Sequence, residues 1–235
     1  MKKMIPNIIT LMNLFSGCIG VVFVFTSDPR LASLMIFISL LLDYMDGGAA
    51  RLLNVKSELG KELDSLADLI SFGLLPSLIA YIILRTGDYP SLAYIAFLMT
   101  VMSAYRLAKF NLDERQSENF IGLPTPANAI FWSAFPLVIY GDPNSVVEIS
   151  MASLMVESRV IMILIVVFSY LLIAEIPLFS LKFSDLRWKN NAYRFVFLIM
   201  SVILFVLMSY YALPFIILLY LLISILKNKF AQHEI

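Results

Sequence analysis

The sequence predicts an all-α protein of the membrane, a polytopic bundle of about eight transmembrane helices. The chain has 235 residues, of which 60% are hydrophobic and only 14% are charged, whereas an average soluble domain has about 45–50% apolar residues. The mean hydropathy is +0.88. The apolar residues also form long runs, and a helix needs about 20 mainly apolar residues to cross a bilayer. We interpret residues 1–235 as a single membrane domain.

Charged or Gly/Pro-rich segments separate the apolar runs and give the boundaries of the predicted spans. In chain order we expect them at residues 8–26, 31–53, 58–84, 91–110, 125–140, 160–181, 193–210 and 213–226. The first follows Lys2 and Lys3 and resembles a secretory signal, but further hydrophobic segments follow it, so we interpret it as a retained helix. The second ends near Arg51. Ser57 precedes the third as a candidate N-cap.

The later spans have less regular boundaries. The fourth ends in a basic segment that contains Arg106 and Lys109, and the fifth is short and contains Pro136. A turn-rich connection, roughly 141–159, follows the fifth span and is expected to carry a short surface helix. The sixth span contains an acidic residue, Glu175, and the last two are hydrophobic runs.

The distribution of Lys and Arg predicts the orientation, because positive residues accumulate on the cytoplasmic side of membrane proteins. We place on that side both termini and the connections after the second, fourth and sixth spans. Only Arg30, Arg85 and Arg159 of the 17 basic residues then fall on the other side. We therefore expect an integral protein of the cell membrane with both termini cytoplasmic.

Four aspartates form a fixed pattern around the connection between the second and third spans: Asp43-x2-Asp46-Gly47-x2-Ala50-Arg51-x8-Gly60-x3-Asp64-x3-Asp68. A carboxylate between apolar runs is costly and indicates a functional site. Because successive residues of a helix are about 100° apart, each pair of acids shares one stripe of its helix with small residues. A short loop joins the two helices, so the stripes can face each other and bring the four carboxylates into one cavity at the cytoplasmic end.

Four carboxylates in a space of low dielectric constant need cations between them, because like charges repel strongly there. Oxygen-only ligands select hard ions such as Mg²⁺ or Mn²⁺, and a pair of metal ions suits displacement at phosphorus. Gly47, Ala50 and Gly60 would let a bulky ligand lie against helix backbone, and Arg51 suits a phosphate group or a nucleobase. The alternatives are a structural cluster with small residues for helix packing, and a capping role alone for Ser57.

Composition argues against several other functions. Cys18 is the only cysteine, and His233, in the polar tail, is the only histidine. We therefore expect any acid-base chemistry to rely on carboxylates. The formal net charge is zero, which does not favour binding to nucleic acid. The expected partners are membrane lipids and small polar molecules.

The aspartate pattern resembles, at every fixed position, the signature of the CDP-alcohol phosphotransferase family. The resemblance implies an enzyme in which Asp43, Asp46, Asp64 and Asp68 hold two divalent ions, Mg or Mn. It implies that Asp68 is also the base that takes a proton from the acceptor alcohol, and that the protein is a homodimer. It implies nucleotide contacts for six residues: Asn7, Gly47, Ala50, Arg51, Ser57 and Gly60.

Two further stretches indicate which alcohol is the acceptor. Residues 6–17 and 105–127 resemble conserved blocks of the phosphatidylserine synthase branch of the family. The resemblance implies CDP-diacylglycerol, or an archaeal ether-linked equivalent, as donor and L-serine as acceptor, with release of CMP. Arg106 and Lys109 are candidates for binding the serine carboxylate, and Glu175 for its ammonium group. The alternatives are headgroup anchoring for the two cations and a structural ion pair for Glu175.

Three other functions fit part of the pattern. A family member that uses glycerol phosphate or inositol phosphate would need a denser basic pocket. An intramembrane prenyltransferase also binds magnesium through aspartates, but on well-separated spans, whereas both pairs here lie within 26 residues. A metal-ion transporter lined by the four aspartates is the non-enzymatic alternative, although transport gives no reason for Gly47, Arg51 and Gly60.

Overall fold

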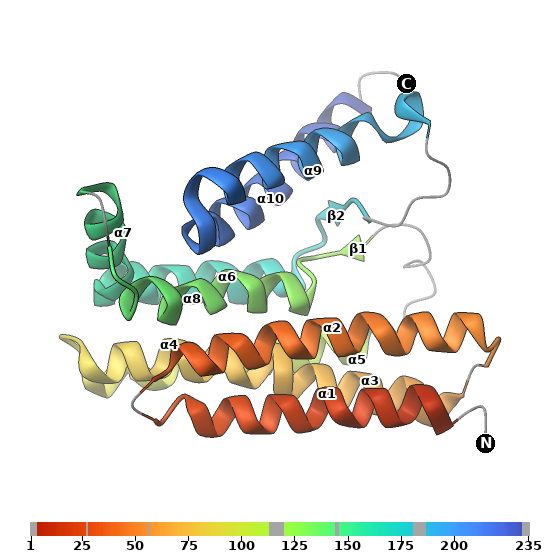
Figure 1. The fold of residues 1–235 in the computed structure, drawn as a ribbon, viewed down its shortest axis with the longest axis horizontal. Helices are drawn as coiled ribbons and strands as arrows, with labels where there is room; N and C mark the ends of the chain where they lie inside the picture. The colour runs from red at the N-terminus through yellow and green to blue at the C-terminus, as the bar shows by residue number, and fades with distance from the viewer. Residues whose placement is uncertain are drawn as a thin grey trace.

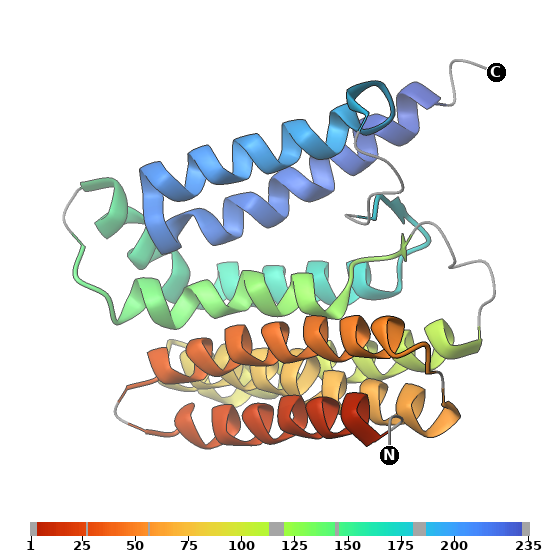
Figure 2. The same ribbon diagram turned by 45° about the vertical axis from the view of Figure 1, so that its right-hand side comes forward.

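The computed structural model describes residues 4–26, 28–55, 57–112, 120–143, 146–180 and 187–231. Within these ranges the fold is almost entirely helical, which confirms the predicted class, and the helices lie in three layers (Figures 1 and 2). The first layer contains α1 (Met4–Phe23), α2 (Arg30–Leu52), α3 (Glu58–Asp68), η1 (Leu69–Leu74), α4 (Leu75–Thr86), η2 (Pro90–Ala96) and α5 (Phe97–Leu112).

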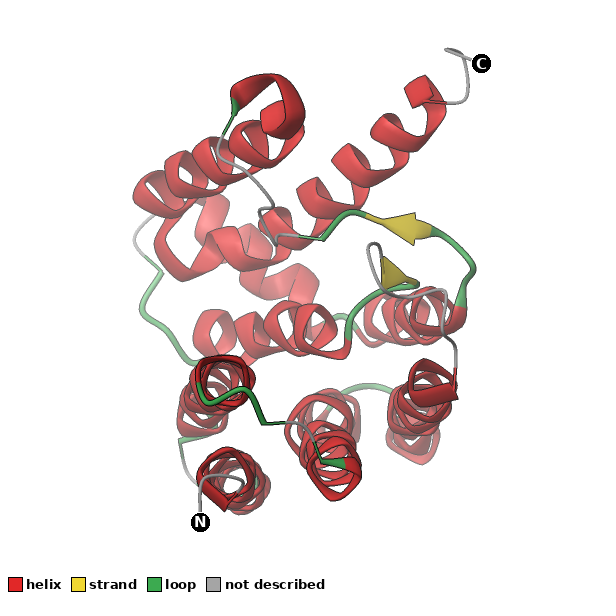
Figure 3. Cartoon of the chain, turned by 90° about the vertical axis from the view of Figure 1, so that its right-hand side faces the viewer, coloured by secondary structure: helices red, strands yellow, loops and turns green. Residues whose placement is uncertain are grey.

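The other two layers cover one face of this first layer. The second consists of α6 (Thr125–Ile139) and α8 (Ser158–Ile173), with the short α7 (Val146–Val156) at one end. In the third, α9 (Trp188–Met208) and α10 (Ala212–Ala231) fold back on each other at η3 (Ser209–Tyr211). Two short strands, β1 (Phe120–Ile121) and β2 (Pro177–Leu178), pair antiparallel at the opposite end from α7. Figure 3 views the bundle from that end.

The number of membrane crossings is only partly supported. Among the described residues, five helical segments are long and apolar enough to cross a membrane, or six if the bent pair α7 and α8, with an angle of 72° between them, forms one span. One of the five, Asn191–Lys229, has 39 residues and covers most of α9 and of α10. Helix α6 is shorter, with 15 residues. Eight crossings therefore remain a prediction.

The predicted sixth span, 160–181, begins inside α8 but is wrong at its C-terminal end. Helix α8 begins at Ser158 and ends at Ile173, so Glu175 lies in an exposed, non-helical segment and not inside a span. Proline disfavours the helical conformation in the residue before it, and here Pro177 begins β2, which pairs with β1. Hydropathy alone does not detect this ending because the apolar run continues. The short helix expected between 141 and 159 is confirmed as α7.

The ends of the helices agree with the predicted grouping of charge. Helix α1 begins and α10 ends at the same end of the bundle, where α2 also ends and α3 begins (Figure 1). Basic residues occupy the last turns of α2, α5 and α10 at this end: Arg51, Lys109 and Lys229. The three residues assigned to the other side, Arg30, Arg85 and Arg159, lie at the opposite helix ends. Five basic residues used in that argument lie outside the described residues: Lys2, Lys3, Lys56, Arg115 and Lys182.

Close packing of α1 against η1 brings the first three helices together. A Cβ atom on Gly17 would lie 2.4 Å from the Ser71 Oγ atom and 3.1 Å from its Cα atom, so glycine lets the two backbones approach this closely. The η1 segment is a π-helix that ends just before Pro76. Proline cannot donate a hydrogen bond to the preceding turn, and short π-helical insertions are frequent at functional sites. The α1, α2 and α3 helices thus converge where the aspartates lie.

Candidate active site

The aspartates lie on two facing helices near one end of the bundle. Asp43 and Asp46 are in the second half of α2, and Asp64 and Asp68 are on α3. The hydroxyl oxygen of Ser57 accepts a hydrogen bond of 2.9 Å from the Gly60 backbone N–H. Ser57 is therefore the N-cap of α3, as expected, and this cap fixes where the helix begins.

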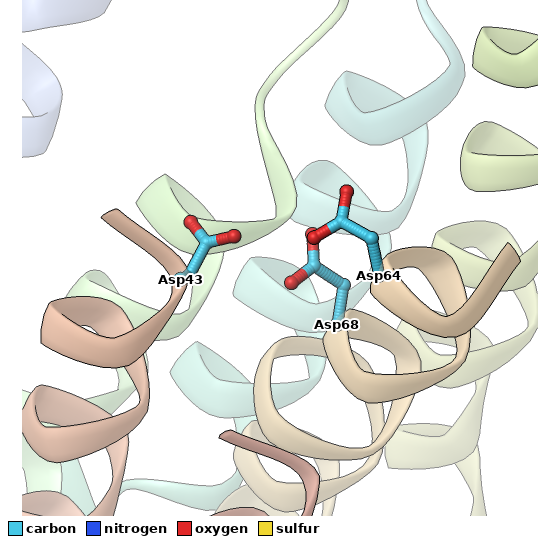
Figure 4. Close-up of side chains that lie close together, drawn as sticks. All are labelled: Asp43, Asp64 and Asp68. Carbon is cyan, nitrogen blue, oxygen red and sulfur yellow. The ribbon is translucent and has the colours of Figure 1, made fainter. Parts of the chain in front are cut away.

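Three of the carboxylates form a compact cluster. Oxygen atoms of Asp43, Asp64 and Asp68 lie within 4.8 Å of one another, and Figure 4 shows the side chains pointing from α2 and α3 into the space between the helices. Asp68 is only 8% exposed, and its Oδ1 atom has no hydrogen-bond partner in the described part of the chain. Three converging carboxylates, one of them buried with an unpartnered oxygen atom, fit a hard divalent cation.

Asp46 lies beside this cluster but has a different neighbour. It is 6% exposed, and its Oδ2 atom accepts a hydrogen bond of 2.5 Å from the Thr10 hydroxyl group on α1. A hydrogen bond to a carboxylate is stronger than one between neutral groups, so Thr10 fixes the orientation of Asp46. Sequence reasoning assigned no role to Thr10. Its signals are its place in the 6–17 block and its position one helical turn after Asn7 and Pro6.

A cavity of about 590 Å³ opens next to the carboxylates. Of the six residues expected to contact the nucleotide, five line it: Asn7, Gly47, Ala50, Ser57 and Gly60. Arg51 is exposed and is not among the lining residues. The other lining residues are Pro6, Thr10, Asp43, Asp46, Val55, Glu58, Lys61 and Asp64.

Two of the glycines serve this cavity in different ways. A Cβ atom on Gly47 would meet no other atom within 4 Å, so this position faces open space in the cavity. A Cβ atom on Gly60 would lie 2.9 Å from Oδ1 of Asn7. Gly60 therefore lets the Asn7 side chain approach the first turn of α3, whereas Gly47 leaves room for a ligand.

The three residues considered for serine binding lie in two places. Arg106 on α5 is 7% exposed and close enough to Asp68 to interact with it electrostatically. Its Nε atom has no hydrogen-bond partner among the residues that the structure describes, and its guanidinium lies 5.9 Å from the centre of the Phe110 ring. By contrast, Lys109 and Glu175 form a 3.0 Å ion pair with each other, and the Glu175 side chain is largely exposed.

Comparison with known proteins identifies the family to which the chain belongs. The profile of the CDP-alcohol phosphatidyltransferase family matches residues 3–171, which include the whole aspartate pattern and most of the first two layers. The chain therefore belongs to this family. Helices α9 and α10 lie beyond the matched residues.

The chain is also similar to individual members of the family that have been named for their reactions. The chain is 38% identical to the CDP-diacylglycerol–serine O-phosphatidyltransferase of Helicobacter pylori over 127 residues, 53% of this chain and 54% of the relative. It is 38% identical to the Bacillus subtilis protein of that name over 123 residues, 52% of this chain and 69% of the relative. It is 28% identical to the archaetidylserine synthase of Methanothermobacter thermautotrophicus over 162 residues, 68% of this chain and 66% of the relative. The match thus spans about half the length of the Helicobacter protein.

Proposed function

We propose that this protein transfers the phosphatidyl group of CDP-diacylglycerol, or of an ether-linked equivalent, to the hydroxyl group of L-serine and releases CMP. The observation that carries this proposal is the carboxylate cluster beside a cavity lined by five of the six expected nucleotide contacts. The names of the relatives support serine as acceptor. Family membership supports the use of a CDP-linked donor.

The cluster is suited to holding two divalent cations, Mg²⁺ or Mn²⁺. Asp43, Asp64 and Asp68 already converge within 4.8 Å, and Asp46 lies at the edge of the same cavity. When bound, such ions stabilise negative charge on the diphosphate and on the leaving phosphate. Gly47 and Ala50 leave space for the nucleotide against the backbone of α2, and Asn7 and Ser57 present polar atoms to it.

Asp68 is the proposed general base. It is the most deeply buried of Asp43, Asp64 and Asp68, and it lies beside Arg106, close enough to interact with it electrostatically. Asp68 takes the proton from the serine hydroxyl group, the serine oxygen forms a bond to the lipid-side phosphorus, and the bond from that phosphorus to the CMP oxygen breaks. Close placement of the base and the acceptor lowers the entropic barrier.

Arg106 is the proposed ligand of the serine carboxylate. Its guanidinium is buried beside Asp68, so a carboxylate bound there would place the serine hydroxyl group near the base. A planar guanidinium can bind a carboxylate through two parallel hydrogen bonds. Lys109 and Glu175 bind each other near the surface, and their part in serine binding remains a proposal.

The site lies at the end of the bundle where basic residues gather, and we infer that this end faces the cytoplasm. There the nucleotide and serine reach the cavity from water while the lipid chains remain in the bilayer. The expected homodimer remains a prediction from family membership.

The deciding experiment measures CMP release by the purified protein with CDP-diacylglycerol and one of three acceptors: serine, glycerol phosphate or inositol phosphate. We expect release with serine only. Release with a phosphorylated acceptor instead of serine would replace this function by that of another family member. Uptake of Mn²⁺ into sealed vesicles without CMP formation would identify a transporter.

A further inference from the structure

A second polar layer lies directly beneath the aspartate cluster. Helix α2 runs toward the open end of the cavity, so Ser39, four residues before Asp43, lies about 6 Å deeper on the same stripe. Helix α3 runs in the opposite direction, so Ser71, three residues after Asp68, also lies deeper. Both hydroxyl groups belong to residues without exposed surface. Helix α2 thus carries Asp43 with Ser39 below it, and α3 carries Asp64 and Asp68 with Ser71 of η1 below them.

Asn13 on α1 completes this layer. It follows Thr10, the partner of Asp46, by three residues and is therefore about one turn deeper. Its backbone carbonyl oxygen accepts hydrogen bonds from Ser71 Oγ at 3.2 Å and from Ser39 Oγ at 3.4 Å. These two bonds place Asn13 between α2 and η1, at the floor of the cluster.

The side-chain amide of Asn13 makes no hydrogen bond to the described residues. It is 0% exposed, and neither Oδ1 nor Nδ2 has a hydrogen-bond partner among the described residues. The serine hydroxyl groups bind its backbone and not its amide. Above it, the buried Oδ1 atom of Asp68 is also unpartnered. Buried polar groups without a protein partner commonly bind an ordered water molecule.

We propose that Asn13 is a positioning residue for the metal cluster. Its amide holds one buried water molecule against the inner oxygens of Asp43 and Asp68, and this water fixes the direction in which the carboxylates face the cations. The inference rests on the proposed function, because it requires that the cluster binds divalent metal. Loss of such a group outside the ligands typically weakens metal affinity about 10- to 100-fold.

A side chain that only filled space would behave differently. Leucine has nearly the shape of asparagine, so Asn13→Leu keeps the packing and removes both hydrogen-bonding groups. Neither amide atom has a hydrogen-bond partner among the described residues, so the substitution leaves none of their polar groups newly unsatisfied, and a change of this kind can be nearly neutral or stabilising. The unfolding temperature of the metal-free protein is therefore expected to stay equal or rise. Metal affinity distinguishes a space-filling role of Asn13 from a positioning role, because Asn13→Leu should lower the affinity only if Asn13 positions the cluster.

The test is Mn²⁺ binding to the purified full chain in detergent, without lipid substrate or serine, with free Mn²⁺ followed by its EPR signal. We expect the Mn²⁺ dissociation constant to rise about 10-fold or more in Asn13→Leu, and to rise in Asn13→Ala as well. Ser16→Ala is the matched control. Ser16 is buried on the same helix, but its hydroxyl group donates to the Met35 carbonyl oxygen (3.2 Å), away from the cluster. The Mn²⁺ dissociation constant of Ser16→Ala should equal that of the unsubstituted protein.

The outcomes separate this inference from the proposed function. Equal Mn²⁺ affinity in both Asn13 variants and in the control would overturn the positioning role and leave the metal cluster in place. An unsubstituted protein that binds no Mn²⁺ would overturn the proposed function, and this inference with it. Weaker Mn²⁺ binding in folded Asn13→Leu protein of unchanged thermal stability would support the positioning role.

Discussion

Substitution of Gly47 by alanine should stabilise the protein and impair its activity. Gly47 lies inside α2 and lines the cavity, and an added Cβ atom would meet no protein atom within 4 Å. The methyl group therefore costs nothing in packing, and replacing glycine by alanine within a helix contributes about 0.5–1 kcal/mol. For a chain of this size, this corresponds to a rise in unfolding temperature of about 1–4 °C.

In contrast to its stabilising effect, Gly47→Ala should lower kcat/KM for the CDP-lipid donor. The methyl group would occupy space that we assign to the nucleotide, and an extra methyl group in a well-packed site costs about 1–3 kcal/mol. The expected loss in kcat/KM for CDP-diacylglycerol is therefore about 5- to 150-fold, since each 1.4 kcal/mol is a factor of ten. CMP release at varied donor concentration measures this loss, and thermal unfolding in detergent measures the gain.

Gly48→Ala is the control for both effects. Gly48 is the next residue of the same helix, and its Cβ atom would also meet nothing within 4 Å, but it does not line the cavity. It should show the same rise in unfolding temperature with unchanged kcat/KM. If Gly47→Ala and Gly48→Ala turn over CDP-diacylglycerol equally well, the nucleotide does not lie against Gly47.

Four other outcomes are expected. Asp68→Asn should abolish CMP release while the protein still binds the CDP-lipid, and near-normal turnover would exclude Asp68 as the base. Arg106→Lys should raise the serine KM with little change for the CDP-lipid, because an ammonium group cannot form the paired hydrogen bonds of a guanidinium; an effect on the lipid KM alone would contradict this assignment. EDTA should stop the reaction, and Mg²⁺ or Mn²⁺ should restore it, whereas full activity in EDTA would exclude the metal cluster. Gly122→Ala should lower the unfolding temperature, because Gly122 has φ +77° and a Cβ atom would lie 2.8 Å from the Leu172 carbonyl oxygen; an unchanged value would show that the turn relaxes freely.

The aspartate cluster could be predicted because its geometry is mostly local. The spacing from Asp43 to Asp46 and from Asp64 to Asp68 follows the helical repeat, and the connecting loop is too short to let the two stripes separate widely. The Ser57 cap has a local cause as well. These features depend on residues that are close in sequence, so a single sequence is enough to predict them.

Contacts between distant helices could not be predicted in this way. Thr10 binds Asp46 across 36 positions of the chain, and only the packing of α1 on α2 decides this partnership. The same packing buries Asn13. Arg51 adjoins Ala50 in sequence, but a step of about 100° around the helix takes it away from the cavity wall. Its contact with the nucleotide remains a prediction.

Hydropathy likewise misjudged where one helix ends. The run from 160 to 181 is apolar throughout most of its length, yet α8 ends at Ile173. The backbone N–H of Gly122 donates to the Ile176 carbonyl oxygen at 2.9 Å, and that of Leu123 to the Leu171 carbonyl oxygen at 2.8 Å. These bonds fasten the start of α6 to the end of α8. Backbone pairing of this kind leaves no trace in side-chain hydrophobicity.

The residues that form the cluster and line the cavity all lie between Pro6 and Asp68, on the first three helices and the short loop after α2. A chain is synthesised from its N-terminus, so these helices leave the ribosome before α6 to α10 exist. Contacts that are local in sequence also form fastest. We therefore predict that the nascent chain assembles its acids early, and that the divalent cations of the proposed function bind them already during biogenesis.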